Sequence, residues 1–586
     1  MINQLKKIGF KLDQTTGVWQ KKNQVNFSYS DGDDIENYLL DSIRNCKDKS
    51  ISSVELNQYI KDWPTLYHLS RRRSNIIRPF ASFLKGKKVL EIGCGCGALS
   101  RFLGEVGAEL IAVEGSSRRA LITRERCKDL KNVNVVAATS ELVADLRELD
   151  VVILNGVLEY SPKYLGVNGH LTLLKTVFNQ LNEKGKLILS IENQMGLKYF
   201  AGQPEDHAGQ PMYGINDSYR EGEFKTWGKK ELKEILKRIG FKKIDQYIPL
   251  PDYKLPISII TPFGWENFSE ELVPLAIDSI CEDPQRKNID LFSMEKSYIS
   301  TWKNGLASDL ANSFLFIANR EDKPGKIIAT DSVAFSFKDN FEIGVNEGIE
   351  FKKEKKNSEI TLNYFQIDQV EGNLKYTRTE IFRSKESYLF KLLQIVNQTG
   401  WDLNDILVWV KPWIEALKNE AYSQDGRVES MKIDKSHWNS VPVNCVLIES
   451  NKILLPRSPK NNEEIDLTLV IYHGLKLSLE RISSVNKIED NIELTRKNIV
   501  QYIFSSLLNI NIDEEQLIEL EKKELSISKK IILENTHFNK DIIQQRESLE
   551  DLQNRATALD STLKQVTNSV SWKITRPLRK LIRLIL

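Results

Sequence analysis

The sequence lacks several features that would assign its class directly. No run of about 18 apolar residues occurs, so no segment is expected to span a bilayer. The 82 Lys and Arg residues nearly equal the 80 Asp and Glu residues, which gives no reason to expect a nucleic-acid partner. Only six cysteines are scattered over 586 residues, and the opening MINQLKKIGF has no apolar signal core. These absences predict a cytoplasmic protein whose contact with a membrane, if any, is peripheral.

Proline and glycine are also missing between residue 512 and Pro577. Apolar residues there alternate spacings of three and four, which is the heptad pattern of a coiled coil. We therefore expect a coiled coil over 512–571 that makes the protein a homo-oligomer. A helix packed on its own globular domain is the alternative. The seam comprises Leu549, Leu552, Ala556, Leu559, Leu563, Val566 and Val570, preceded in the same register by Ile531, Phe538 and Ile542.

Residues 572–586, WKITRPLRKLIRLIL, contain no acid and separate basic from apolar side chains. On a helix the two sets lie on nearly opposite faces. This pattern predicts an amphipathic helix on an anionic membrane surface, such as the inner face of the cell membrane, and docking on a protein surface is the alternative. The basic face holds Arg576, Arg579, Lys580 and Arg583, and the apolar face holds Leu578, Leu581, Ile582 and Ile585.

A chain of this length exceeds one ordinary core, so several domains are expected. Residues 1–60 have a mixed pattern and form an N-terminal extension. Over 61–260, strand-like runs such as KKVLEIG, ELIAVEG and LDVVILNG alternate with amphipathic helices, which predicts an α/β domain with a doubly wound parallel sheet. Over 261–511, hairpin-like strands and a helical stretch near 385–420 predict a separate α+β domain.

A glycine-rich loop follows the first of these strands, in VLEIGCGCGALSRFL at 89–103. Alternate glycines between a strand and a helix let the backbone approach a ligand closely. Gly93, Gly95 and Ala98 also satisfy the loose dinucleotide fingerprint, so a nicotinamide or flavin ligand has to be considered. Glu91 argues against it, because a carboxylate at the strand end suits a cationic group such as an α-ammonium and repels a pyrophosphate.

A second acid, Glu114, ends the next strand, where a carboxylate accepts hydrogen bonds from two ribose hydroxyls. With these acids, the segment from Glu91 through Gly93, Gly95 and Gly97 resembles the first motif of class I S-adenosylmethionine-dependent methyltransferases. LDVVILNGVLEY at 149–160 resembles their fourth-strand motif. The resemblance implies a Rossmann-like fold and S-adenosylmethionine as cofactor, held by Glu91, Gly93, Gly95, Gly97 and Glu114, with Asn155 and Glu159 beside its methionine end.

Two nearby features of the sequence give no further support to this resemblance. Thr139 and Ser140 stand where many members of the family carry an acid near the adenine. Cys94 and Cys96 form a CxC without nearby partners, which is a weak metal signal, so no metal ligand is predicted.

A long polar insert at 195–228 follows the strand LILSIEN and is expected to bind the acceptor. Methyl transfer to a hydroxyl needs alignment of the two substrates and removal of a proton. His207, with Glu205 and Asp206 beside it, is the predicted base or positioning group, and Tyr213 is predicted to contact a sugar. A histidine exposed on the surface loop, or a Glu/Asp/His metal cluster, are the alternatives.

The insert, together with 63–79 and 250–258, resembles bacterial methyltransferases associated with O-antigen and other surface polysaccharides. The chain end, NSVSWKITRPLRKLIRLIL, is similar to a tail that recurs in polysaccharide enzymes. Asn439 and Asn444 have the spacing of a kinase catalytic loop, so 261–511 resembles a degenerate kinase-like domain, with an unrelated α+β module as the alternative. These likenesses imply an acceptor that is a glycan or a glycolipid.

The sequence therefore predicts an enzyme that methylates a sugar hydroxyl or a terminal phosphate of a bacterial surface polysaccharide or its lipid-linked precursor. Two alternatives stay open. One is a non-catalytic scaffold that organises glycan-assembly enzymes, and the other is a lipid or quinone methyltransferase. The intact set of glycines and acids in the loop favours an enzyme over a scaffold.

Overall fold

A computed structural model describes most of the chain. The description leaves out residues 22–31, 288–290, 338–346, 355–358, 368–374, 383–386, 424–426, 449–451, 457–462, 489–493, 529–542, 547–548, 570–571, 573–574 and 576–586. Among the described residues, no helix has the length and apolar character needed to cross a membrane.

Fourteen strands in the described part of the chain form one mixed sheet, in the order β1-β2-β5-β4-β3-β6-β7-β10-β8-β9-β11-β12-β13-β14. Pairing is parallel from β2 to β7 and antiparallel from β7 onward. The strands are β1 Lys11–Leu12, β2 Trp19–Gln20, β3 Lys88–Ile92, β4 Glu109–Glu114, β5 Val133–Ala137, β6 Leu149–Asn155, β7 Leu181–Glu192, β8 Lys243–Leu250, β9 Ser258–Ile260, β10 Ser313–Asn319, β11 Ser332–Phe337, β12 Glu347–Lys353, β13 Ile360–Gln366 and β14 Tyr376–Ile381.

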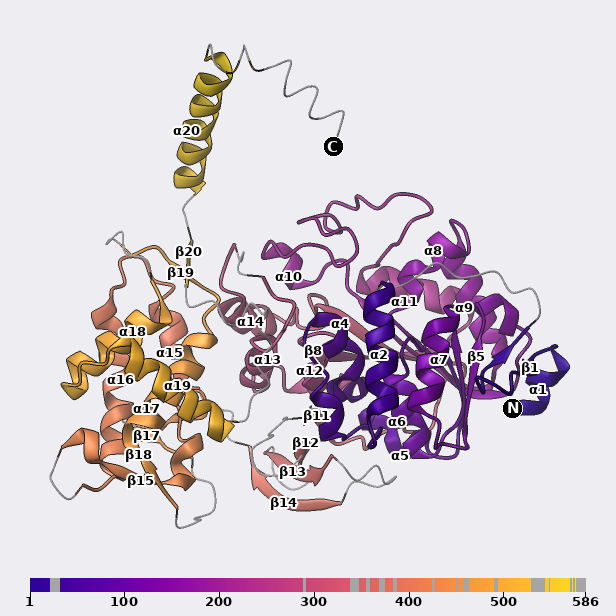
Figure 1. Cartoon of the computed structure of the whole chain (residues 1–586), viewed down its shortest axis with the longest axis horizontal. Coiled ribbons are helices and arrows are strands. Elements are labelled where there is room, and N and C mark those ends of the chain that lie inside the picture. Colours follow the sequence, from indigo (N-terminus) through magenta and orange to yellow (C-terminus); the bar gives the residue numbers. More distant parts are fainter. Residues whose placement is uncertain are drawn as a thin grey trace.

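Helices cover both faces of the parallel half of this sheet, as the alternating sequence pattern predicts (Figure 1). The central strands are buried almost throughout, since both of their faces pack against helices. Amphipathic spacing fixes which side of each helix is buried. For example, α11 (Lys229–Ile239) buries Leu232, Ile235 and Leu236. These helices are α6 Ala98–Val106, α7 Ser117–Arg126, α9 Gly169–Gln180 and α11 Lys229–Ile239.

The N-terminal residues belong to this domain and do not form a separate extension. β2 pairs with β5 in parallel, and α2 (Asp33–Asn45) packs on α7. The Arg119 Nε donates to Glu36 Oε1 over 2.8 Å, and both side chains are buried. The other α-helices described before β3 are α1 Ile2–Lys7, α3 Val54–Asn57, α4 Trp63–Leu69 and α5 Ala81–Leu84. The predicted division at residue 60 is therefore not a boundary in the fold.

The predicted boundary at residue 260 also requires correction. β10 lies between β7 and β8 and pairs with both, although the sequence placed it in the domain 261–511. It returns to the sheet after an insertion that contains α12 Pro262–Asn267, α13 Val273–Ile280 and α14 Met294–Lys303. A strand so far along the chain from its partners leaves no local signal of its pairing. Strands β9 and β11 to β14 then extend the same sheet.

A helical lobe follows, on the left in Figure 1. Its helices are α15 Tyr388–Ile395, α16 Leu403–Lys418, α17 Leu467–Glu480, α18 Arg496–Ile503 and α19 Glu514–Ser528, and two small ladders pair β15 Lys432–Asp434 with β18 Glu464–Asp466 and β16 Val446–Ile448 with β17 Lys452–Leu454. Trp413 is fully buried at its centre, 2.6 Å from where a side chain on Gly474 would begin. Asn444 Nδ2 donates to the backbone oxygen of Asn439 over 3.1 Å, so these asparagines close a turn.

The segment 512–571 is not the continuous coiled coil that its heptads predict. α19 packs on α17, where Glu524 accepts from His473 Nδ1 at 3.0 Å and from Lys476 Nζ at 2.7 Å. β20 (Gln544–Arg546) then pairs in parallel with β19 (Ser484–Asn486), because the extended backbone completes a short ladder on the lobe.

Only α20 (Leu549–Asn568) keeps a helical part of the predicted seam, and Figure 1 shows it standing clear of the body. Leu559, Leu563 and Val566 are 63%, 59% and 44% exposed. Ile531, Phe538, Ile542 and Val570 lie outside the described residues, as does the predicted membrane helix of 572–586 except Trp572 and Thr575.

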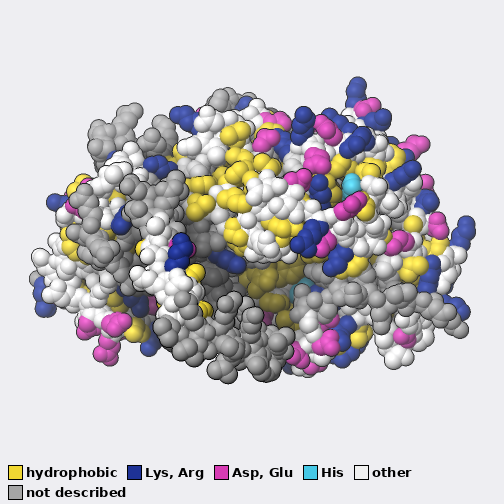
Figure 2. Space-filling view, turned by 90° about the horizontal axis from the view of Figure 1, so that it is seen from above, with side chains coloured by type: hydrophobic (Ala, Val, Ile, Leu, Met, Phe, Trp, Pro, Cys, Tyr) yellow, Lys and Arg dark blue, Asp and Glu magenta, His cyan; other side chains and the backbone are white. Residues whose placement is uncertain are grey.

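Figure 2 shows that Lys, Arg, Asp and Glu are interspersed on the face seen from above, and that hydrophobic side chains gather near its middle. This mixture agrees with the near balance of charge in the sequence.

Candidate active site

The glycine loop after β3 is tightly constrained, and its three glycines have different surroundings. Gly93, Gly95 and Gly97 have φ of 75°, 56° and 78°, which side chains rarely adopt. A Cβ on Gly93 would lie 2.5 Å from Val157 Cγ2, and one on Gly97 would lie 3.0 Å from Thr123. A Cβ on Gly95 would meet no described atom within 4 Å. The outer glycines therefore permit close packing, and Gly95 faces open space.

That space is a cavity of about 280 Å³ at the carboxyl ends of β3, β4 and β6. It is lined by five of the predicted cofactor residues, namely Glu91, Gly93, Gly95, Glu114 and Asn155. Gly97 and Glu159, which were predicted with them, do not line it. Thr139 and Ser140 line one end, and the neighbouring Glu141 supplies an acid there that the sequence did not assign.

Glu114 is held in place by the backbone of two turns. Its Oε2 accepts from the Gly95 N–H over 2.8 Å and its Oε1 from the Ser116 N–H over 2.9 Å. Burial raises the pKa of Glu114, and these N–H groups oppose that shift. Each oxygen keeps a second lone pair, which suits the two adjacent hydroxyls of a ribose.

Glu91 lies deeper and is only 3% exposed. Its Oε2 accepts from the Ser100 hydroxyl over 2.6 Å. Burial raises the pKa of Glu91 to about 7, against the opposing effects of Ser100 and Arg73. A cationic group entering the cavity would stabilise the ionised form of this carboxylate.

Arg73, in the 3₁₀ helix Arg71–Ile76, is a cavity residue that the sequence interpretation missed. Its guanidinium lies 4.2 Å from the centre of the Tyr67 ring and donates to the Lys254 carbonyl over 3.0 Å. With its amide oxygen turned toward Arg73, Asn155 accepts from this guanidinium at 2.6 and 3.3 Å and donates to Ser190. The run RRR at 71–73 was the available signal, but nothing local distinguishes the arginine that enters the cavity.

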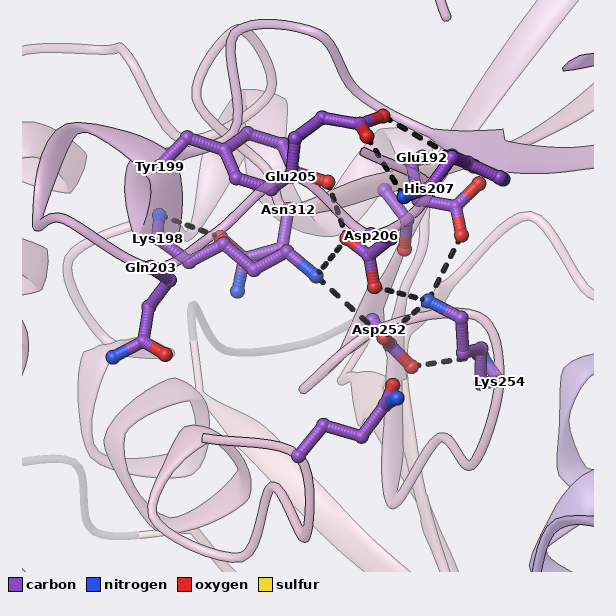
Figure 3. Close-up of polar contacts among 12 residues, drawn as sticks. Glu192, Lys198, Tyr199, Gln203, Glu205, Asp206, His207, Asp252, Lys254 and Asn312 are labelled. Carbon is purple, nitrogen blue, oxygen red and sulfur yellow. Dashed lines mark hydrogen bonds and ion pairs between the residues drawn. The ribbon is translucent and has the colours of Figure 1, made fainter. Parts of the chain in front are cut away.

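A buried charged cluster lies on the other side of the turn that follows β6 (Figure 3). We use this name for Glu159, Glu192, Lys198, Glu205, Asp206, His207, Asp252 and Lys254. It brings together the predicted Glu205, Asp206 and His207 with side chains from β7 and from the segment after β8. The insert 195–228 is thus partly an interior element, so the alternative of an exposed surface-loop histidine does not hold for His207, whose side chain is 6% exposed.

His207 is oriented by two carboxylates. Its Nδ1 lies 3.1 Å from Glu205 Oε1, and its Nε2 lies 4.0 Å from Glu159 Oε1. Burial lowers the pKa of His207, but Glu192, Glu205 and Glu159 outweigh burial and raise it to about 9. A base has to be unprotonated, so this raised pKa favours the predicted positioning role of His207 over its predicted role as a base.

The carboxylate of Asp206 accepts hydrogen bonds from three neighbouring side chains. It accepts from Tyr199 Oη at 2.5 Å, Lys198 Nζ at 2.8 Å and Lys254 Nζ at 2.6 Å. Burial would raise the pKa of Asp206, but the two lysines hold it well below its usual range. Its carboxylate therefore chiefly neutralises the two lysines, and its predicted catalytic role stays a prediction.

Tyr213 belongs to a group of aromatic rings built by the insert. Phe224 stacks on His207 with 5.1 Å between ring centres, and Tyr213 lies 6.2 Å from Phe224 and 5.4 Å from Tyr219. The prediction placed Tyr213 next to the acceptor, and the structure places it one ring away from His207.

The cavity and the charged cluster meet at the turn from Asn155 to Tyr160. Tyr160 lines the cavity, and its ring lies 5.1 Å from that of His207. On the same turn a Cβ on Gly156 would lie 2.7 Å from Tyr253 Oη, which donates to Glu192 Oε1 over 3.1 Å. A ligand in the cavity therefore lies next to the charged cluster.

Comparison with known proteins agrees with this geometry. A family model described as a methyltransferase domain matches residues 67–246. A ubiquinone biosynthesis O-methyltransferase of Glaesserella parasuis is 28% identical over 145 residues, which cover 24% of this chain and 59% of that protein. The chain thus matches less than two thirds of the length of this relative.

Solved methyltransferase structures show low sequence identity to this chain and low TM-scores. A phosphoethanolamine N-methyltransferase 2 from Haemonchus contortus, solved with S-adenosylhomocysteine, is 16% identical with a TM-score of 0.27, covering 43% of this chain and 52% of that one. A candidate S-adenosylmethionine-dependent methyltransferase from Listeria monocytogenes is 14% identical with a TM-score of 0.27, covering 43% of this chain and 98% of that one.

Proposed function

We propose that the methyltransferase domain matched over residues 67–246 transfers the methyl group of S-adenosylmethionine to an oxygen of a polar acceptor. The acceptor is a sugar hydroxyl or a terminal phosphate of a bacterial surface polysaccharide or its lipid-linked precursor. The observation that supports this choice is the charged cluster with aromatic rings beside the cofactor cavity.

The cofactor is oriented by the polar groups of the cavity. Glu114 takes the ribose, and Thr139 to Glu141 lie on the adenine side. Glu91 attracts the α-ammonium, and Arg73 is the cation available for the carboxylate of the methionine. This orientation directs the sulfonium methyl toward the turn 155–160, beside the charged cluster.

The acceptor side suits a polyhydroxylated molecule. Buried carboxylates accept hydrogen bonds from hydroxyl groups, and the rings of Tyr160 and Phe224 offer flat faces for the C–H groups of a sugar. The chain's contribution is to align the acceptor oxygen with the methyl carbon and the sulfur in an in-line displacement. His207, held by Glu205 and facing Glu159, orients the acceptor there.

A quinone or lipid acceptor is the second candidate, since the curated relative is named for O-methylation in ubiquinone biosynthesis. That name supports an oxygen acceptor. A charged cluster with five buried carboxylates is a poor environment for an apolar quinone tail, which favours the glycan.

The test offers S-adenosylmethionine with a labelled methyl group to the full-length protein. One reaction contains lipid-linked glycans and phosphate-ended oligosaccharides, and a parallel reaction contains a phenolic quinone precursor. We expect label in the glycan fraction and none with a Glu114→Ala variant. Label only in the quinone precursor would establish the second candidate, and cofactor binding without any transfer would favour the non-catalytic scaffold.

A further inference from the structure

Three side chains of the charged cluster present ligand atoms to one another. Glu159 lies on the turn after β6, Glu192 ends β7, and His207 comes from the insert. Among the described residues, one ligand atom from each lies within 4.8 Å of the other two. Their side chains are 1%, 1% and 6% exposed. Three distant segments thus converge on one buried point.

Two oxygens at this point have no hydrogen-bond partner among the described residues. Glu159 Oε2 and Glu192 Oε2 are both buried and accept nothing, although the other oxygen of Glu192 accepts from Tyr253 and Lys254. Leaving a carboxylate oxygen dry and unpaired is unfavourable. A ligand that supplies positive charge there would satisfy both oxygens.

The imidazole of His207 is held in the orientation of a metal ligand. Glu205 Oε1 lies 3.1 Å from His207 Nδ1, and the other ring nitrogen, Nε2, is directed toward Glu159. Glu205 is itself fixed, because its Oε2 accepts from the N–H groups of His207 and Ala208 at 2.7 and 2.6 Å. A carboxylate behind an imidazole is the usual support for a histidine that binds a metal through its other nitrogen.

The charge balance of the cluster also favours a cation. Five carboxylates, those of Glu159, Glu192, Glu205, Asp206 and Asp252, face two lysines and the imidazole of His207, which leaves an excess of two negative charges when all of these groups are ionised. Both lysines are directed mainly at Asp206, and only Lys254 reaches Glu192. Oε2 of Glu159 and Oε2 of Glu192 accept from neither lysine.

We propose that Glu159, Glu192 and His207 Nε2 bind one divalent transition-metal cation, Mn²⁺ or Zn²⁺. One nitrogen and two carboxylate oxygens suit these ions, whereas Mg²⁺ and Ca²⁺ prefer oxygen ligands alone. Metal–ligand bonds of about 2.0–2.2 Å require the three atoms to close inward from their present separation. Three protein ligands leave coordination positions of such a cation open for an acceptor oxygen.

The role of this cation rests on the proposed function, but its binding does not. An acceptor hydroxyl bound to the cation loses its proton to solvent more readily. The resulting oxygen attacks the methyl carbon, so that a C–O bond forms and the S–C bond breaks. The electron pair of that bond stays on sulfur, which converts the sulfonium to a neutral thioether.

The binding test uses the full-length protein after dialysis against a chelator. Calorimetric titration with Mn²⁺ and with Zn²⁺, and the electron paramagnetic resonance of Mn²⁺, should report one site per chain. The double variant Glu159→Gln, Glu192→Gln should lose the site, and Glu205→Gln should weaken it about 10- to 100-fold.

Glu524→Gln is the matched control, since it removes a buried carboxylate that holds another histidine, His473, at 3.0 Å. It should bind the cation like the wild type. Retained binding of S-adenosylmethionine shows that each variant is folded. Affinity weaker than about millimolar in the wild type, or equal affinity in the double variant, would overturn the site.

The labelled-methyl assay separates the two proposals. Transfer to a glycan that persists at full rate in chelator, with no cation bound, would overturn the metal site and leave the proposed function intact. Tight cation binding that is lost in the double variant, with no glycan labelled, would support the site and refute the acceptor.

Discussion

The cofactor cavity and the charged cluster share the turn from Asn155 to Tyr160 but hold their polar groups by different means. Glu114 in the cavity is fixed by backbone N–H groups of the glycine loop and of its own turn. In the charged cluster, Asp206 is fixed by Lys198 and Lys254 through their side chains. In the cofactor cavity, backbone hydrogen bonds therefore hold Glu114 in place. In the charged cluster, ion pairs between buried side chains hold Asp206 in place.

This difference predicts how each side responds to substitution. Removing a side chain from the cavity deletes a contact with the ligand and leaves the backbone donors able to bind water. Removing one charge from the cluster leaves a buried opposite charge without a partner, which destabilises the whole fold. The predictions below test that contrast, from the largest expected effect to the smallest.

Lys254→Ala should destabilise the protein most. Lys254 Nζ contacts Glu192 at 2.8 Å and Asp206 at 2.6 Å, so its loss strands buried carboxylates at an expected penalty of about 3–5 kcal/mol in the free energy of unfolding. Urea and thermal unfolding measure the change. Lys243→Ala is the control, because its ion pair with Asp245 is half-exposed and worth about 0–1 kcal/mol. Equal losses in the free energy of unfolding for the two variants would refute the idea that Lys254 stabilises the fold by neutralising buried carboxylates.

Glu114→Ala should act on the ligand and spare the fold. Loss of charge-assisted hydrogen bonds to the ribose should reduce affinity for S-adenosylmethionine by about 1.5–3 kcal/mol, or roughly 10- to 150-fold. S-Adenosylhomocysteine should lose as much, since it carries the same ribose. Calorimetry measures both ligands, and unchanged affinities would place the ribose elsewhere.

Glu91 should make cofactor affinity depend on pH. Its pKa of about 7 means that the carboxylate is mostly ionised at pH 8 and mostly neutral at pH 6, so affinity for the α-ammonium should fall up to about tenfold on acidification. Calorimetry at the two pH values should show this dependence in the wild type and a flatter one in Glu91→Gln.

Stability without ligand should move in the opposite direction. The pKa of Glu91 is raised on folding, so its contribution to stability is fully present below its unfolded value of 4.5 and is lost as the pH rises through about 7. Glu91→Gln should remove that part of the pH dependence of the melting temperature. An identical profile in the variant would assign the pH dependence to other groups.

Leu563→Asn on α20 should have the smallest effect on either side of the site. Leu559, Leu563 and Val566 are exposed, so the substitution should leave cofactor affinity and stability of the body unchanged. If α20 associates with copies of itself, light scattering should show a larger species in the wild type and a mass near 67.4 kDa in the variant. A wild-type mass near that of one chain would refute the predicted homo-oligomer.

The methyltransferase domain was predicted from a few residues, and the match of residues 67–246 to a methyltransferase-domain model confirms that prediction. Glu91, the glycines and Glu114 lie within two neighbouring strand–loop units, so their spacing along the chain fixes their spacing in the fold. The sequence failed where partners are distant. Arg73 entering the cavity, Glu192 joining Glu159 and His207, and β10 entering the sheet all depend on packing between remote segments.

By itself, then, the sequence determined the features that local physics controls: the alternation of strands and helices, the tight glycine loop, and the two acids at strand ends. The tertiary structure alone decided the rest. It placed a late strand between two early ones, interrupted the heptads of 512–571 with a strand, and gathered two carboxylates and a histidine from three segments beside the cofactor cavity. The reason is that burial and charge compensation depend on which distant segments pack together, and the local hydrophobic periodicity of the sequence does not specify that packing.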